Sequence, residues 1–224
     1  MIEIFKIKTS VESAIIGTFP QIEEKWLGPT NFWGENSYTK TPLQGPIEFQ
    51  IIFPQFRLSP RGRLTDFVSS VNVQRNYLFI SDKLWAIIRK FELDEHQQFD
   101  VPVYVNGKTH DFHLIYFPWP RSDDFIDWKE SSFFQIDESG GQFIKAFENT
   151  RDYQFNNRPN DLIVRKNQIT LFEDKIKWDV FRFTNFDSGF FVSKRLKEAM
   201  ESAEITGVVY EPAIWMPNQP SWHP

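Results

Sequence analysis

Residues 76–117 read N-Y-L-F-I-S-D-K-L-W-A-I-I-R-K-F-E-L-D-E-H-Q-Q-F-D-V-P-V-Y-V-N-G-K-T-H-D-F-H-L-I-Y-F. Residues 76–80 are extended in character. Ser81 then offers a side-chain oxygen that can cap a helix N-terminus, and Asp82 suits the first helical turn. Apolar residues follow at the helical spacing i, i+3, i+4 and i+7, namely Leu84, Ile87, Ile88 and Phe91. This segment therefore predicts a strand followed by an amphipathic helix with one buried stripe.

The second part of the stretch predicts a β-hairpin. Residues 101–105 are strand-like, Asn106-Gly107 follows, and residues 108–117 return. Asn-Gly is favoured in the tight type I′ turn because both central residues adopt positive φ. We expect two antiparallel strands joined at Asn106-Gly107.

The chain contains a second copy of the strand–serine–helix pattern. Residues 79–84 (F-I-S-D-K-L) align with residues 191–196 (F-V-S-K-R-L), and Ile88 aligns with Met200. We predict that Ser193 is an N-cap like Ser81, and that Leu196, Ala199 and Met200 form the buried stripe of its helix. Two explanations stay open, duplication of a structural unit and convergence on a common supersecondary form.

The remaining sequence predicts mostly strands and turns. Residues 9–45 contain many Gly and Pro and predict a long irregular segment held by aromatic side chains. The Pro-Trp-acidic stretch at 118–131 is interpreted as a loop. Strands are predicted at 2–8, at 46–53 ending at Pro54, at 132–136 and 142–147 around Gly140-Gly141, at 162–165 and 168–172 turned near Lys166-Asn167, at about 175–183, and at 207–210.

Together these elements predict an α+β fold with mostly antiparallel sheet and two amphipathic helices. One interpretation is that the fold contains a pseudo-duplicated unit. With 224 residues, the chain suits one compact domain over 1–224, or two closely packed halves at about 1–120 and 121–224. The 24 Phe and 8 Trp indicate an aromatic core.

Composition narrows the function classes. The sequence has no Cys, which excludes disulfides, thiolate metal ligands and cysteine nucleophiles and fits a reducing compartment. The N-terminus lacks the features of a signal peptide, and no apolar run is long enough for a membrane helix. We therefore expect a cytoplasmic protein. The net charge of −5 disfavours nucleic-acid binding and suits solubility or a basic protein partner.

No metal or cofactor site is expected. His110 and His113 are close in sequence but lie three apart on a predicted strand, so they point to opposite faces and do not chelate one ion together. The carboxylates after Pro118-Trp119-Pro120 lack the spacing of a calcium loop. Phosphate-loop, nucleophile-elbow, zinc-protease and kinase signatures are all missing. The sequence therefore favours a binding protein over an enzyme.

The paired strand–serine–helix units carry a resemblance. Residues 79–84, His96-Gln97-Gln98-Phe99 before the Asn-Gly turn, residues 191–196 and Ile205-Thr206-Gly207-Val208 together resemble a family of bacterial immunity proteins. Members of such a family are encoded beside polymorphic or contact-dependent toxins. The resemblance covers about 70–117 and 170–212 and implies direct binding of a cognate toxin, with no catalytic residues.

Within that hypothesis, the predicted partner-binding surface is the loop after Pro118. Its Trp side chains suit the core of a protein interface, and its carboxylates suit the rim, where charge speeds association. The predicted contact residues are Trp119, Asp123, Asp124, Asp127, Trp128 and Glu130. The alternative for both Trp is that they hold the loop against the core. The alternative functions are an enzyme with a dispersed active site and a structural or oligomeric scaffold.

Overall fold

The described residues form three β-sheets and several short helices, which confirms the predicted α+β class with mostly antiparallel pairing. The structure is a computed structural model that describes residues 3–27, 30–70, 73, 76–119, 124–136, 142–149, 152, 163–183 and 189–212. Gly140-Gly141 and the proline-rich tail from residue 213 lie outside the described residues.

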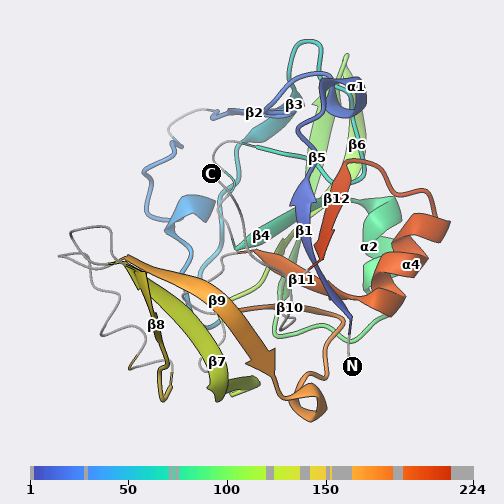
Figure 1. Cartoon of the computed structure of the whole chain (residues 1–224). Helices are drawn as coiled ribbons and strands as arrows, with labels where there is room; N and C mark the ends of the chain where they lie inside the picture. The colour runs from blue at the N-terminus through green and yellow to red at the C-terminus, as the bar shows by residue number, and fades with distance from the viewer. Residues whose placement is uncertain are drawn as a thin grey trace.

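The first sheet joins the two ends of the described chain. Its four strands are all antiparallel and run in the spatial order β10 (Val180–Arg182), β11 (Phe190–Ser193), β1 (Ile4–Thr9) and β12 (Val208–Pro212). Figure 1 shows β1, in blue, between β11 and β12, in orange and red. The N-terminal strand is therefore an interior strand of this sheet.

The second sheet contains the predicted hairpin. Its order is β2 (Ile22–Lys25), β3 (Gln55–Leu58), β5 (Gln97–Val105), β6 (Lys108–Tyr116) and β4 (Tyr77–Ser81), with one parallel pair, β3 and β5. Asn106 and Gly107 have φ of 48° and 79°, as a type I′ turn requires. β4 pairs with residues 112–116 of β6. The β5–β6 hairpin consequently extends beyond the end of β4.

The third sheet is a three-stranded antiparallel layer. Its order is β8 (Gln142–Lys145), β7 (Ile126–Ile136) and β9 (Ile163–Leu171). The register between β7 and β9 shifts between Asp127 and Ser132, and again before Phe133. Such register shifts mark a β-bulge, which increases the local twist of a strand.

Helices α2 (Asp82–Ile88) and α4 (Lys194–Ser202) follow β4 and β11 directly, as the two sequence copies predicted. Leu84, Ile88, Leu196 and Met200 are buried, while Ile87, Phe91 and Ala199 are partly buried. The irregular N-terminal segment adds a short helix, α1 (Ser13–Ile16), and a 3₁₀ turn, η1 (Tyr38–Lys40). A second 3₁₀ turn, η2 (Glu173–Lys175), precedes β10. None of the described helices has the length and apolar character that a membrane span requires.

Three apolar clusters alternate with the sheets. One packs α2 and α4 between the first and second sheets, and includes Ile7, Leu78, Ile115 and Val192. The second fills the space between the first and third sheets with Phe rings. The third lies under the N-terminal segment, on the other face of the second sheet. Strands β4 and β11 are buried on both faces, which explains their continuous apolar sequences.

Residues 46–53 do not form the predicted strand. Ile52 forms only an isolated β-bridge with Ser37. The strand that pairs within the sheet is β3, which begins after Pro54. The Ile47 N–H donates instead to the side-chain Oε1 of Gln97, at 2.7 Å. This segment therefore crosses the third cluster as irregular backbone whose polar groups find individual partners.

Two further strand predictions are wrong. Residues 163–171 form one continuous strand rather than a hairpin at Lys166-Asn167, because the long strand β7 offers a partner along its length. The strand expected at 175–183 reduces to the three residues of β10, after η2. Lys-Asn also lacks the glycine that a tight I′ turn favours.

Candidate functional site

The segment predicted to contact a partner is largely a strand. β7 begins at Ile126, so Asp127 and Trp128 lie in the sheet rather than in a loop. Trp128 is only 9% exposed, and its ring stacks on Phe133 with 6.0 Å between the centroids. Strand alternation directs this ring into the core, which fits the alternative that Trp128 holds the segment against the core, and contact of Trp128 with a partner stays a prediction.

Trp119 is half-buried and bonded internally. Its indole Nε1 donates to Asn76 Oδ1 at 3.1 Å, and its backbone N–H donates to Leu43 O at 2.7 Å. Arg182, buried on β10, donates to the same Asn76 oxygen at 2.9 Å and to Phe117 O at 3.2 Å. These bonds hold the chain after β6 to the core, which matches the structural alternative for Trp119.

The acidic members of the segment differ in exposure. Asp124 and Glu130 are exposed. Asp127 is half-buried, and its Oδ1 accepts the N–H groups of Lys129 and Glu130 at 3.2 and 3.3 Å, so this carboxylate closes a local turn. Asp123 lies outside the described residues. Asp124 and Glu130 are thus the described carboxylates of this segment that face solvent.

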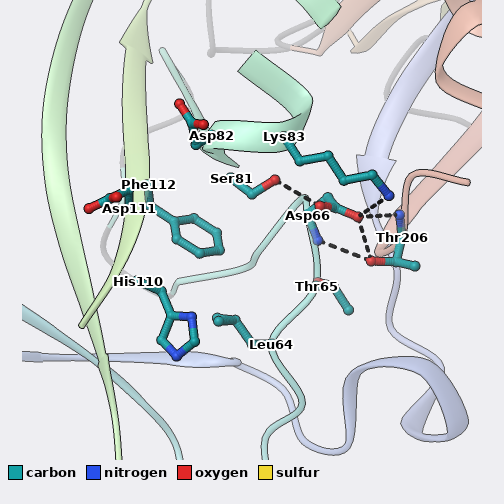
Figure 2. A pocket seen from close by; sticks show the side chains of 10 residues that line it. All are labelled: Leu64, Thr65, Asp66, Ser81, Asp82, Lys83, His110, Asp111, Phe112 and Thr206. Atoms are coloured by element: carbon teal, nitrogen blue, oxygen red, sulfur yellow. Dashed lines mark hydrogen bonds and ion pairs between the residues drawn. The ribbon is translucent and has the colours of Figure 1, made fainter. Parts of the chain in front are cut away.

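A hollow of about 380 Å³ lies where α2 begins. It is lined by residues 64–66, residues 81–83, residues 110–112 of β6, and Thr206 (Figure 2). These parts meet because β4 ends at Ser81 while β6 continues past it. Sequence reasoning missed this site, since its four contributors are far apart in the chain.

Asp66 is the central acceptor of the hollow. Its Oδ1 accepts the Ser81 hydroxyl at 2.8 Å, and its Oδ2 accepts both the N–H and the hydroxyl of Thr206 at 2.9 and 2.8 Å. Lys83 Nζ lies 3.9 Å from the same oxygen, and Figure 2 shows these side chains converging. Asp66 therefore joins the start of α2 to the segment that follows α4.

Ser81 has the role of an N-cap. Its Oγ accepts the N–H of Leu84 at 3.2 Å while its hydroxyl proton goes to Asp66. His113 is the adjacent imidazole, but β6 pairs it with Ile80, whereas Ser81 faces Phe112. Side chains of neighbouring strand residues point to opposite faces. The hydroxyl and the imidazole therefore do not form a nucleophile–base pair.

Ser193 occupies the equivalent position at α4. Its Oγ accepts the N–H of Leu196 at 3.3 Å and donates to Asp179 Oδ1 at 2.5 Å. Asp179 is 2% exposed and also accepts two bonds from Arg195 and the N–H of Glu92. Burial by itself raises the pKa of Asp179, but the bonds from Arg195, Ser193 and Glu92 outweigh burial and lower it.

Asp66 and Asp179 correspond to each other in the two units. Each accepts the serine that caps its own helix, and each binds backbone beyond the helix of the other unit. The sequence carries a signal for this correspondence: Asp66-Phe67-Val68 is similar to Asp179-Val180-Phe181, and each stretch lies upstream of its capping serine. Both carboxylates are therefore structural acceptors.

His113 connects α2 to the β5–β6 hairpin. It is 7% exposed, with Nδ1 2.9 Å from Asp100 Oδ1 and Nε2 3.2 Å from Asp82 Oδ1. Only the doubly protonated ring can donate to both carboxylates. Hydrogen bonds from Gln98 and His113 lower the pKa of Asp100. Both carboxylates nevertheless remain mostly in solvent, with side chains 71% exposed for Asp82 and 81% for Asp100.

His110 and His113 are separated as strand geometry predicted: His113 is buried beside α2, whereas His110 is exposed and lines the hollow. In the part of the chain that the structure describes, no three His, Asp or Glu side chains are grouped so as to hold a metal ion.

Comparison of the sequence with protein-family models and with curated proteins gave no match in either case. The functional argument therefore rests on the residues of this chain.

Proposed function

We propose that this protein is an immunity protein that neutralises a cognate bacterial toxin by direct binding in the cytoplasm. The resemblance of its paired strand–serine–helix units to bacterial immunity proteins is the observation that carries the proposal. A protein of this type requires a complementary surface and no catalytic group.

The use of polar groups in the described residues supports a binding role. Two serine–aspartate pairs could suggest a catalytic role, Ser81 with Asp66 and Ser193 with Asp179. Their polar groups instead cap helices and bind between the two units. Exposed carboxylates remain on the surface, and such groups accelerate association with a basic partner.

The resemblance implies that a toxin gene lies beside this gene, and co-expression of the two genes tests the proposal. We expect cells producing both proteins to grow, and cells producing the toxin alone to stop growing. A toxin variant inactivated in its own active site should form a stoichiometric complex with the purified protein in size-exclusion chromatography. Absence of both protection and complex would refute the immunity function.

The acidic segment supplies a second arm of this experiment. In the D124N/E130Q variant, two exposed charges are lost while the turn made by Asp127 is kept. If this surface steers the toxin, the variant should associate more slowly and with a weaker dependence on salt concentration. Unchanged association kinetics would remove the segment from the proposed interface without affecting the proposal of immunity.

A further inference from the structure

The turn of the β5–β6 hairpin places two reactive groups next to each other in solvent. Asn106 and Gly107 are both exposed, with φ of 48° and 79°. Among the described residues, neither the side chain of Asn106 nor the N–H of Gly107 has a hydrogen-bond partner. A Cβ added at Gly107 would meet no atom within 4 Å. The side-chain amide of Asn106 and the main-chain nitrogen that follows it are therefore both accessible.

An asparagine followed by glycine can lose its side-chain amide without an enzyme. The deprotonated main-chain nitrogen of the glycine attacks Cγ of the asparagine and closes a five-membered succinimide ring. The C–N bond of the side-chain amide then breaks, and ammonia leaves. Water adds to either ring carbonyl and reopens the ring to aspartate or isoaspartate, so one amide and one water become one carboxylate and one ammonium ion. Glycine favours ring closure because it has no Cβ to obstruct the attack.

The native turn holds the reacting atoms of this pair apart. Ring closure requires the Gly107 nitrogen and the Asn106 Cβ to lie on the same side of the Asn106 Cα–C bond. The first central residue of a type I′ turn has ψ of about +30°, which places them on opposite sides. Asn106 must therefore leave the turn conformation before it reacts, and Val105 and Lys108, which pair across the turn, must separate.

The tip of the hairpin has little support from the rest of its sheet. β3 pairs with β5 only as far as Tyr104, and β4 pairs with β6 only from Phe112 onward. In the described structure, Val105 and Lys108 thus have each other as their ladder partners, and Lys108 is exposed. Opening of such an end costs less free energy than opening of the core of a sheet. The folded chain can therefore reach the reactive conformation without global unfolding.

We propose that Asn106 is a site of spontaneous deamidation, which converts it with one water to aspartate or isoaspartate, and that opening of the hairpin tip controls the rate. Both products add a carboxylate at the tip. Isoaspartate also carries the main chain through its Cβ, which lengthens the turn by one carbon, and hairpin register depends on turn geometry. The isoaspartate form therefore has a less stable hairpin. This modification is independent of the proposed function, since it uses residues 106 and 107 and water alone.

Peptide mapping by mass spectrometry tests the reaction in the folded protein. Trypsin cleavage after Lys90 and Lys108 releases residues 91–108, in which Asn106 is the single asparagine. Incubation in water labelled with a heavy oxygen isotope should add one labelled oxygen at Asn106. The reaction should be faster in mildly alkaline than in mildly acidic buffer, because the attacking nitrogen must lose its proton.

Asn31 is the internal control for this measurement. It is also exposed, but it precedes Phe32, whose side chain obstructs the attack, and its Oδ1 accepts the N–H of Trp33 at 2.8 Å. We expect Asn31 to remain unmodified while Asn106 reacts. N106Q should give no labelled product at position 106, because its longer side chain would have to close a less favourable six-membered ring. Absence of product at Asn106, or equal labelling at Asn31, would refute the site.

The same incubation in urea tests control by the turn. Unfolding frees Asn106 from the turn conformation, so its labelling should be at least about tenfold faster than in the folded protein. A rate in the folded protein equal to or above that in urea would refute this control.

N106D separates the added charge from the altered main chain. Asp-Gly also favours a type I′ turn, so this variant gains the carboxylate and keeps the native backbone. Protein purified in the isoaspartate form should unfold at a lower urea concentration than N106D. Identical unfolding midpoints would refute the proposed effect on the hairpin.

Discussion

At the scale of single residues, Gly207 shows how tightly the two units are joined. It follows Thr206, the residue that binds Asp66, and has φ of +81°. A Cβ placed there would overlap Thr65 Oγ1 and the carbonyl oxygen of Phe67. The segment after α4 can therefore approach residues 65–67 only because this position lacks a side chain.

We predict that G207A destabilises the protein by about 3 kcal/mol, since it combines a left-handed backbone with steric overlap. G45A is the matched control, because Gly45 has φ of +77° with no atom within 4 Å of the added Cβ. It should cost about 1 kcal/mol. Urea unfolding measures both values, and similar losses would show that the segment moves aside without cost.

Residue chemistry was predictable where it is local. Ser81 and Ser193 could be identified as caps because a cap and its helix are adjacent in sequence. Their partners Asp66 and Asp179 lie 15 and 14 positions upstream, so the bonds between them depend on how the strands pair. The burial of Trp128 likewise depends on strand pairing, because it follows from the start of β7 at Ile126. The acidic composition of the segment had indicated a loop instead.

At the scale of elements, the strands with a strong turn signal or a continuous apolar sequence were predictable. β4 with α2, β11 with α4 and the turn of the β5–β6 hairpin were predicted correctly, but β5 begins at Gln97 rather than at 101, and α2 ends at Ile88, before Phe91. The element boundaries at 46–53 and 163–171 were wrong because both depend on distant partners, the Gln97 side chain in one case and β7 in the other. Local propensity does not encode such partners.

The caps provide a prediction for the two helices. S81A should cost about 1 kcal/mol through loss of the cap. S193A should cost about 1 kcal/mol more: both substitutions remove a hydroxyl donor from an aspartate, but the side chain of Asp179 is 2% exposed compared with 14% for Asp66, so its lost bond is replaced less well by water. The control S202A changes an exposed residue at the end of α4 and should be neutral. Equal costs for S81A and S193A in urea unfolding would contradict the role of burial.

At the scale of the whole molecule, the two units form a reciprocal arrangement. Asp66 of one unit binds Thr206 beyond α4, and Asp179 of the other binds Glu92 beyond α2. Convergence on a capped helix accounts for Ser81 and Ser193. It does not account for the aspartate upstream of each serine, or for the bond that each aspartate makes beyond the helix of the other unit. The arrangement therefore favours duplication of an ancestral strand–helix unit.

We predict that ionisation of Asp179 contributes to the pH dependence of the free energy of unfolding. Its pKa is lower in the folded chain than the ordinary value near 4, so its contribution is complete above about pH 5 and is lost as pH falls through the folded pKa. D179N should be less stable than the native protein at pH 7. Its stability should fall less steeply below pH 4, by up to about 1.4 kcal/mol per pH unit. Parallel stability curves for the two proteins from pH 2.5 to 7 would contradict this assignment.

The interior position of β1 has a consequence for how the chain is made. Glu3 binds Lys194, 191 positions away, and β1 pairs on one side with β11 and on the other with β12. At roughly 5–20 residues per second, a ribosome needs about 10–40 s to deliver those partners. During that interval the nascent strand carries apolar residues without a sheet to receive them. Lys6 and Lys8, which alternate with these residues, give the waiting strand the charge that discourages its association with other nascent chains.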